Sequence, residues 1–150
     1  LGYDFAITID NDRQYYLEDI PVFISKLESE NNKNLLLIGT QNMEQKMVSV
    51  KNSFKNKISN FLFRVETSVK LIDTQSGYRL YPLKALNKIK FYTNNFEFET
   101  ENIVRAAWDG VTIKNVYVRV FINENKQDLS IRFYKGFIRK SLLNTWLVLV

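Results

Sequence analysis

The run that most constrains the fold is NLLLIGT at residues 34–40, which is apolar almost throughout. A strand with one face in water alternates polar and apolar residues, whereas a strand covered on both faces of a parallel sheet is continuously apolar. Helical periodicity flanks this run, at 18–30 and 54–69, and the alternating strand TIKNVYVRVFI follows at 112–122. Strands that alternate with helices predict a three-layer α/β domain.

The same periodicities predict the other elements and the buried face of each helix. The remaining elements are a strand at 3–9, a loop at 73–82, a short helix at 83–88 and a helix at 99–109 that Gly110 caps. Apolar spacing predicts a core made of Ile20, Phe23, Ile24 and Leu27; of Phe54, Ile58, Phe61, Leu62, Val65 and Val69; of Ile103, Val104, Ala107 and Trp108; and of Val116, Val118 and Val120 on one strand face.

Two carboxylates, Asp10 and Asp12, follow the apolar run YDFAITI. One interpretation is a turn, because Asp and Asn side chains bond their own backbone where strands end. The other is a divalent-metal site that holds a phosphate. Side chains two residues apart on extended backbone share a face, so Asp10, Asp12 and Gln14 could aim three oxygens at one cation. Ligands of open α/β sheets also bind beyond the carboxyl ends of strands.

The chain contains neither histidine nor cysteine, which excludes several kinds of site. Disulfides, thiolate or histidine zinc sites, and Ser-His-Asp catalysis are all impossible here. A metal ion must therefore be held by oxygen ligands, which favours Mg²⁺ or Mn²⁺. Any general acid or base must then be a carboxylate, a lysine or a tyrosine.

The net charge of +5 is concentrated in two stretches. Residues 46–70 hold six basic residues against one acidic residue, and residues 124–150 hold five against two. Such stretches favour anionic partners, namely phosphates, a membrane surface or nucleic acid. Because no nucleic-acid-binding motif accompanies the charge, we expect no nucleic-acid partner. No apolar run reaches the roughly 20 residues that span a bilayer.

Four stretches, in order along the chain, resemble family 2 glycosyltransferases: DNDRQYYLEDIP, IGTQN, DTQSGYRLYP and FEFETENIVRAAWDGVTIKNVYVRV. They are most similar to the branch that contains dolichyl-phosphate mannose synthase and the bacterial polyprenyl-phosphate glycosyltransferases. The motifs of that branch read roughly D-x-D-x-Q-H-x-P-E-x-I, G-x-R, D-x-x-S-G-F-R, and an acidic aromatic stretch before an R-A-x-x-G helix. The resemblance extends from Tyr3 to about Arg139, and DTQSGYRLYP is its most specific piece.

The resemblance implies a partial GT-A fold, an α/β/α sandwich whose C-terminal part would be residues 1–128. It also implies transfer of a sugar from a nucleotide-sugar donor to an acceptor such as a polyprenyl or dolichyl phosphate. Asp10, Asp12 and Gln14 would hold Mg²⁺ or Mn²⁺ against the donor diphosphate. The cation would act as a Lewis acid on the departing nucleoside diphosphate.

The resemblance implies roles for further residues from their positions in these motifs, and each of these residues also has a purely structural interpretation. Arg79 would bind a phosphate or orient the site, or be a solvated loop residue. One of Glu97, Glu99 and Glu101 would deprotonate an acceptor hydroxyl, or these glutamates would simply favour a helix N-terminus. Lys55 and Lys57 could attract an acceptor phosphate or form a solvated helix face. Separately, the four-residue spacing predicts an ion pair between Arg105 and Glu101.

The sequence departs from the family pattern at four positions and in its extent. Tyr15 replaces the motif histidine, Leu17 the proline and Gln41 the G-x-R arginine, while Arg13 adds a cation beside the acidic pair. The nucleotide-binding half of the family would precede Asp10. These departures motivate an alternative, a non-catalytic, truncated and membrane-associated remnant.

The last stretch, 129–150, is expected to form a basic amphipathic helix and the start of a hydrophobic tail. Such a helix would suit the interface of an anionic membrane, and packing on the domain is the alternative. With no signal peptide before Leu1, we expect a cytoplasmic protein that is peripheral to the cytoplasmic face of the membrane.

Overall fold

The structure, a computed structural model, describes residues 2–10, 15–41, 53–74, 76–93 and 96–121. The elements in these ranges are the strands β1 (Phe5–Thr8), β2 (Leu35–Gln41), β3 (Arg79–Pro82) and β4 (Thr112–Val118), the helices α1 (Ile20–Glu30), α3 (Ser53–Thr67), α4 (Leu83–Leu86) and α5 (Phe96–Trp108), and the 3₁₀ turn η1 (Leu17–Asp19). The strands form one sheet in the order β1-β3-β2-β4. In it, β2 and β4 are parallel, and β3 is antiparallel to both β1 and β2.

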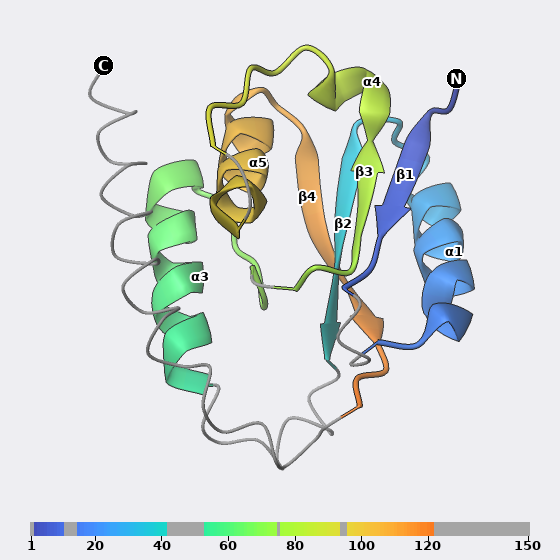
Figure 1. Cartoon of the computed structure of the whole chain (residues 1–150), viewed down its shortest axis with the longest axis horizontal. Coiled ribbons are helices and arrows are strands. Elements are labelled where there is room, and N and C mark those ends of the chain that lie inside the picture. Colours follow the sequence, from blue (N-terminus) through green and yellow to red (C-terminus); the bar gives the residue numbers. More distant parts are fainter. Residues whose placement is uncertain (1, 11–14, 42–52, 75, 94–95, 122–150) are drawn as a thin grey trace.

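Helices cover both faces of this sheet. Helix α1 lies on one side, and α5 with α3 beside it lies on the other (Figure 1). Strand β2 supplies both cores, because Leu35 and Leu37 pack with Phe23 of α1 while the residues between and after them, Leu36 and Ile38, pack toward α5. The continuously apolar run therefore reflects a strand buried on both faces, and the three-layer α/β prediction is confirmed.

The predicted loop at 73–82 is wrong in its second half, because Arg79–Pro82 form β3 in the interior of the sheet. This strand has only four residues, ends in proline and shows no clear alternation, so nothing local identifies it. This strand pairs with β1 on one side and with β2 on the other, so that Leu80 lies opposite both Ile7 and Leu37. The sheet is consequently mixed rather than parallel.

The predicted core side chains of Phe54 and Ile58 lie outside the described part, and four of those that are described lie at the surface instead. Ile24, Phe61, Val65 and Trp108 are exposed, whereas Phe63 and Ala106 are buried. The apolar arc of each helix is wider than the stripe that meets the sheet, so periodicity alone does not locate the buried line. By contrast, Phe23, Ile103, Val104, Val116 and Val118 are buried as predicted.

The ends of the helices lie within three residues of the predicted ends. Gly110 has φ +80°, so the glycine predicted as a helix cap adopts the left-handed conformation that such a cap requires. The first and last strands are shorter than predicted, at Phe5–Thr8 and Thr112–Val118. The basic amphipathic helix and the hydrophobic tail predicted within 129–150 lie outside the described residues. In the described ranges, none of the helices is long and apolar enough to cross a membrane.

Candidate functional site

The start of DNDRQ and the middle of DTQSGYR meet where β1 ends and β3 begins. The carboxyl group of Asp10 occupies the space that a Cβ atom at residue 77 would need, so only glycine allows this approach. Beside this contact, Oγ1 of Thr8 donates a 3.0 Å hydrogen bond to the carbonyl oxygen of Gly77. Asp10 itself is exposed, whereas Gly77 is buried. Two motifs far apart in the sequence thus form one surface at this edge of the sheet.

Polar side chains from α3 and β4 hold the loop that leads to Gly77. The hydroxyls of Ser59 and Thr74 lie 2.9 Å apart, and Thr74 Oγ1 also donates to Asn60 Oδ1 at 3.0 Å. From β4, Asn115 Nδ2 donates to the carbonyl oxygen of Asp73 at 3.0 Å. These residues are not among the predicted site residues, although a polar residue within an otherwise apolar helix or strand pattern is a usable signal.

Arg79 is fully buried, with 0% of its surface exposed, and connects this loop to α5. Its Nε donates to the carbonyl oxygen of Ser76 at 2.6 Å, and its Nη2 to that of Thr74 at 3.1 Å. On the other side, Nη1 donates to the carbonyl oxygen of Glu99 at 2.7 Å and to Asn102 Oδ1 at 3.3 Å. The solvated alternative is wrong, and these contacts orient the loop. Phosphate binding by Arg79 stays a prediction.

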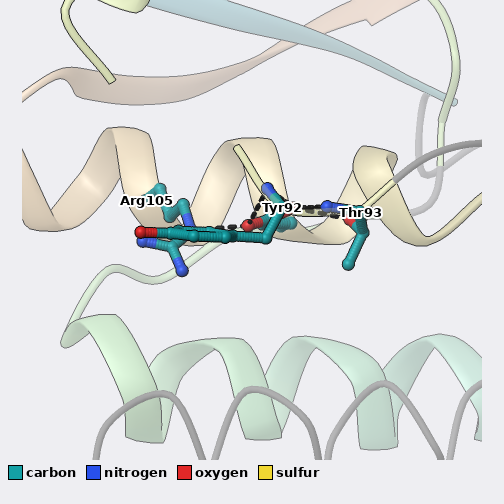
Figure 2. Close-up of polar contacts among 4 residues, drawn as sticks. Tyr92, Thr93 and Arg105 are labelled. Atoms are coloured by element: carbon teal, nitrogen blue, oxygen red, sulfur yellow. Dashed lines mark hydrogen bonds and ion pairs between the residues drawn. The ribbon is translucent and has the colours of Figure 1, made fainter. Parts of the chain in front are cut away.

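Glu101, the third candidate base, is a second buried charge, 2% exposed, and lies on α5 two residues after Glu99. Its carboxylate accepts hydrogen bonds from the main-chain nitrogens of Tyr92 and Thr93, at 3.0 and 2.8 Å, and from Thr93 Oγ1 at 2.5 Å (Figure 2). Arg105 Nε lies 2.6 Å from Glu101 Oε1, which confirms the predicted ion pair. The guanidinium carbon of Arg105 also lies 4.7 Å from the centre of the Tyr92 ring. Burial alone would raise the pKa of Glu101, but these hydrogen bonds hold it below its usual value.

Asp19 and Arg119 anchor the residues that follow DNDRQ. Asp19 is buried and accepts hydrogen bonds from the main-chain nitrogen and Nε of Arg119, at 2.7 and 2.8 Å. The Arg119 guanidinium lies 5.0 Å from the centre of the Tyr16 ring, and Tyr78 Oη donates to the Tyr16 carbonyl oxygen at 3.2 Å. Burial, with the charges of Asp19 and Glu18, raises the pKa of Tyr78. Sequence analysis missed this pair, since its members are far apart along the chain.

No protein-family model matches the chain, and no curated protein matches it significantly. Among solved structures it is similar to the crystal structure of glucosyl-3-phosphoglycerate synthase from Mycobacterium tuberculosis in complex with Mn²⁺ and UDP-glucose. The TM-score is 0.58 at 16% identity, and the match covers 96% of this chain. The chain has a partial GT-A fold. It spans about half of that synthase, because the match covers 50% of the synthase chain.

Within the GT-A fold, Asp10 is the described member of the predicted metal set. Asp12 and Gln14 lie outside the described residues. In the part of the chain that the structure describes, no group of three or more His, Cys, Asp or Glu residues could hold a metal ion. Asp10 fits such a site in chemistry and place, being an exposed oxygen donor at the carboxyl end of a strand.

The other predicted residues fall on α5 and α3 of the GT-A fold. Glu99 is half-buried in the first turn of α5, and the side chain of Glu97 lies outside the described part. Lys57 is exposed on α3, while the Lys55 side chain is also outside that part. The structure therefore joins Asp10, the loop at 73–77 and the start of α5.

The carboxyl end of β2 adds two polar groups to this edge of the GT-A sheet. Thr40 Oγ1 and Gln41 Nε2 are buried and have no hydrogen-bond partner within the described ranges. Gln41 is the residue that the sequence resemblance aligns with the arginine of G-x-R. Its amide nitrogen is thus a donor available at the edge that carries Asp10.

Proposed function

We propose that this chain is part of a glycosyltransferase that moves a sugar from a nucleotide-sugar donor to a polyprenyl or dolichyl phosphate. The observation that carries the proposal is the packing of Asp10 on Gly77, because it brings the acidic motif and DTQSGYRLYP, the most specific motif, together at the carboxyl end of a strand in a GT-A fold. The similar synthase was crystallised with Mn²⁺ and UDP-glucose, which supports a nucleotide-sugar donor and a divalent cation. The lipid-phosphate acceptor is supported by the sequence motifs alone.

The residues proposed to hold Mg²⁺ or Mn²⁺ are Asp10, Asp12 and Gln14, all of them oxygen donors. When bound, the cation would supply Lewis-acid stabilisation of the departing diphosphate. The chain's own contribution is to place Asp10 at the end of β1, where its carboxyl group lies against Gly77. Gln41 would offer its amide to a donor phosphate in place of the family's arginine.

The acceptor side is proposed to lie at the start of α5. Glu97 or Glu99 would remove the proton of an acceptor hydroxyl, whereas a lipid phosphate is already an anion and requires no base. Arg79 fixes the distance between this helix and the Gly77 loop through its bonds to Ser76 and Glu99. The nucleotide-sugar donor and the acceptor substrate would therefore meet between the Gly77 loop and α5, two segments that Arg79 connects.

The test is Asp12→Ala in the intact protein, with Mn²⁺-dependent release of nucleoside diphosphate from UDP-glucose and related donors as the readout. We expect loss of metal-dependent transfer. Asp109→Ala, which removes an exposed carboxylate at the other end of α5, is the matched control and should retain it. Undiminished turnover of Asp12→Ala would show that the metal assignment is wrong.

The alternative function is a non-catalytic, membrane-associated relative of these enzymes, located at the cytoplasmic face. It is favoured by Gln41, which removes the arginine of G-x-R, and by Arg13, which adds a positive charge next to Asp12. This alternative predicts that the intact protein binds anionic vesicles but shows no Mn²⁺-dependent nucleotide binding by calorimetry. Measurable nucleotide binding with Mn²⁺ would eliminate it.

A further inference from the structure

Helix α3 has an outer face on which apolar and basic side chains are mixed. Phe61 is 64% exposed and Val65, one turn later, is 65% exposed. Lys57 and Arg64 are exposed as well. At 3.6 residues per turn these four positions fall within an arc of about 100°. We call this set, Lys57, Phe61, Arg64 and Val65, the α3 outer face.

The opposite side of α3 meets the rest of the domain. Ser59 and Phe63 are buried, Ser59 against Thr74 and Phe63 in the core with α5. The acidic residue of this helix, Glu66, is placed by the helical repeat away from the outer face. The charged members of the α3 outer face are therefore both basic, and its two apolar side chains are not part of the core.

We propose that the α3 outer face binds the surface of an anionic lipid bilayer. Phe61 and Val65 would enter the boundary between headgroups and acyl chains, and Lys57 and Arg64 would contact lipid phosphates beside them. This combination of exposed apolar and basic side chains on one helical face is typical of helices that lie in the plane of a membrane interface. The inference rests on exposure and charge and is independent of sugar transfer.

Charge decides between a bilayer and the other possible occupants of this face. Residues 124–140 carry five basic residues against two acidic ones, so covering the face with that stretch would bring like charges together. The stretch 141–150 carries no charged side chain, and if it covered the face the parent chain would not bind vesicles through α3. A two-fold symmetric contact with a second copy would set Lys57 and Arg64 of one chain against the same residues of the other. An anionic bilayer complements the same charges, and each basic residue near it strengthens binding by roughly fivefold.

The experiment is co-sedimentation of the full chain with vesicles of phosphatidylcholine alone or mixed with phosphatidylglycerol. Two variants alter the face, K57E/R64E and F61S/V65S, and both should fold because all four side chains are exposed. The matched control, K33E/K88E, makes the same charge change at exposed positions elsewhere. Circular dichroism verifies the fold of every variant.

We expect binding to the anionic vesicles that weakens with salt, is lost by roughly tenfold or more in both α3 variants, and is kept within about twofold by the control. Three results would overturn the proposal: no binding by the parent chain, unchanged binding by the α3 variants, or an equal loss in the control. If sedimentation velocity shows a dimer that the α3 variants dissociate, while vesicles are not bound, the face joins two copies and the proposal is wrong. None of these readouts depends on transferase activity.

Discussion

Arg79 Nη1 lies 2.7 Å from the main-chain carbonyl oxygen of Glu99, and the same buried guanidinium donates to the carbonyl oxygen of Ser76 from its Nε. One planar cation therefore holds the loop before β3 and the start of α5 at a defined separation. A guanidinium suits this position because its donors form a rigid fork, which a lysine ammonium does not provide.

Replacing Arg79 by lysine should destabilise the protein by about 2–3 kcal/mol, because several buried carbonyl oxygens lose their donors. Urea denaturation followed by circular dichroism measures the change in the free energy of unfolding. Arg64→Lys, at an exposed position on α3, should leave the midpoint unchanged. A midpoint for Arg79→Lys equal to that of the parent would mean that the connection is not needed for stability.

Gly77→Ala should move the Asp10 carboxyl group, since the added Cβ would take its place. If Asp10 is a metal ligand as proposed, the affinity for Mn²⁺ should fall by roughly tenfold or more in a titration followed by electron paramagnetic resonance.

Gly110→Ala is the contrasting glycine substitution. Residue 110 has φ +80° with open space around it, so the expected cost is about 1 kcal/mol of stability from backbone conformation and no change in Mn²⁺ affinity. If the Gly77→Ala and Gly110→Ala variants bind Mn²⁺ with equal affinity, the residue at position 77 does not influence the metal site.

Glu101 should make stability depend on acid pH. Its pKa in the folded chain is lower than its ordinary value of 4.5, so its contribution is complete above that pH and is lost as the pH falls through the folded value. Glu101→Gln should be less stable than the parent by about 2–3 kcal/mol at pH 7, and the difference should shrink below pH 4.5.

The measurement for Glu101 is urea denaturation of both proteins from pH 7 downward, and Glu28→Gln, at an exposed position, is the control. A difference between parent and Glu101→Gln that stays constant with pH would mean that the carboxylate charge does not contribute.

Trp108 and Ile103 lie on the same helix and should respond very differently to truncation. Trp108 is 42% exposed, with one hydrogen bond from Nε1 to the Glu66 carbonyl oxygen at 3.0 Å, so Trp108→Ala should cost about 1 kcal/mol. Ile103 is fully buried, and Ile103→Ala should cost about 3 kcal/mol. Thermal denaturation of the two variants measures the stability that each one loses. A larger loss for Trp108→Ala than for Ile103→Ala would mean that the Trp108 ring is part of the core.

Much of the architecture follows from local patterns. Strand β2 was predictable because burial on both faces leaves a continuous apolar run, and the cap at Gly110 because a left-handed residue favours glycine. The pair of Glu101 and Arg105 follows from helical spacing alone. The acidic motif and the lack of histidine also restrict any metal site to oxygen ligands.

Other features depend on partners that are distant along the chain. Strand β3 carries no pattern of its own and exists because β1 and β2 lie on either side of it. The burial of Arg79 and the exposure of Trp108 depend on which stripe of α5 faces the sheet, and the apolar arc of that helix is too wide to specify it.

By itself, the sequence determined the α/β class, the covered central strand and the chemistry that a metal site could use. Only the tertiary structure decided that Asp10 packs on Gly77 and that Arg79 joins that loop to α5. Local periodicity records which faces of an element are apolar. Contacts between distant loops depend on sheet order and on the direction from which each helix packs, and neither is encoded in a local repeat.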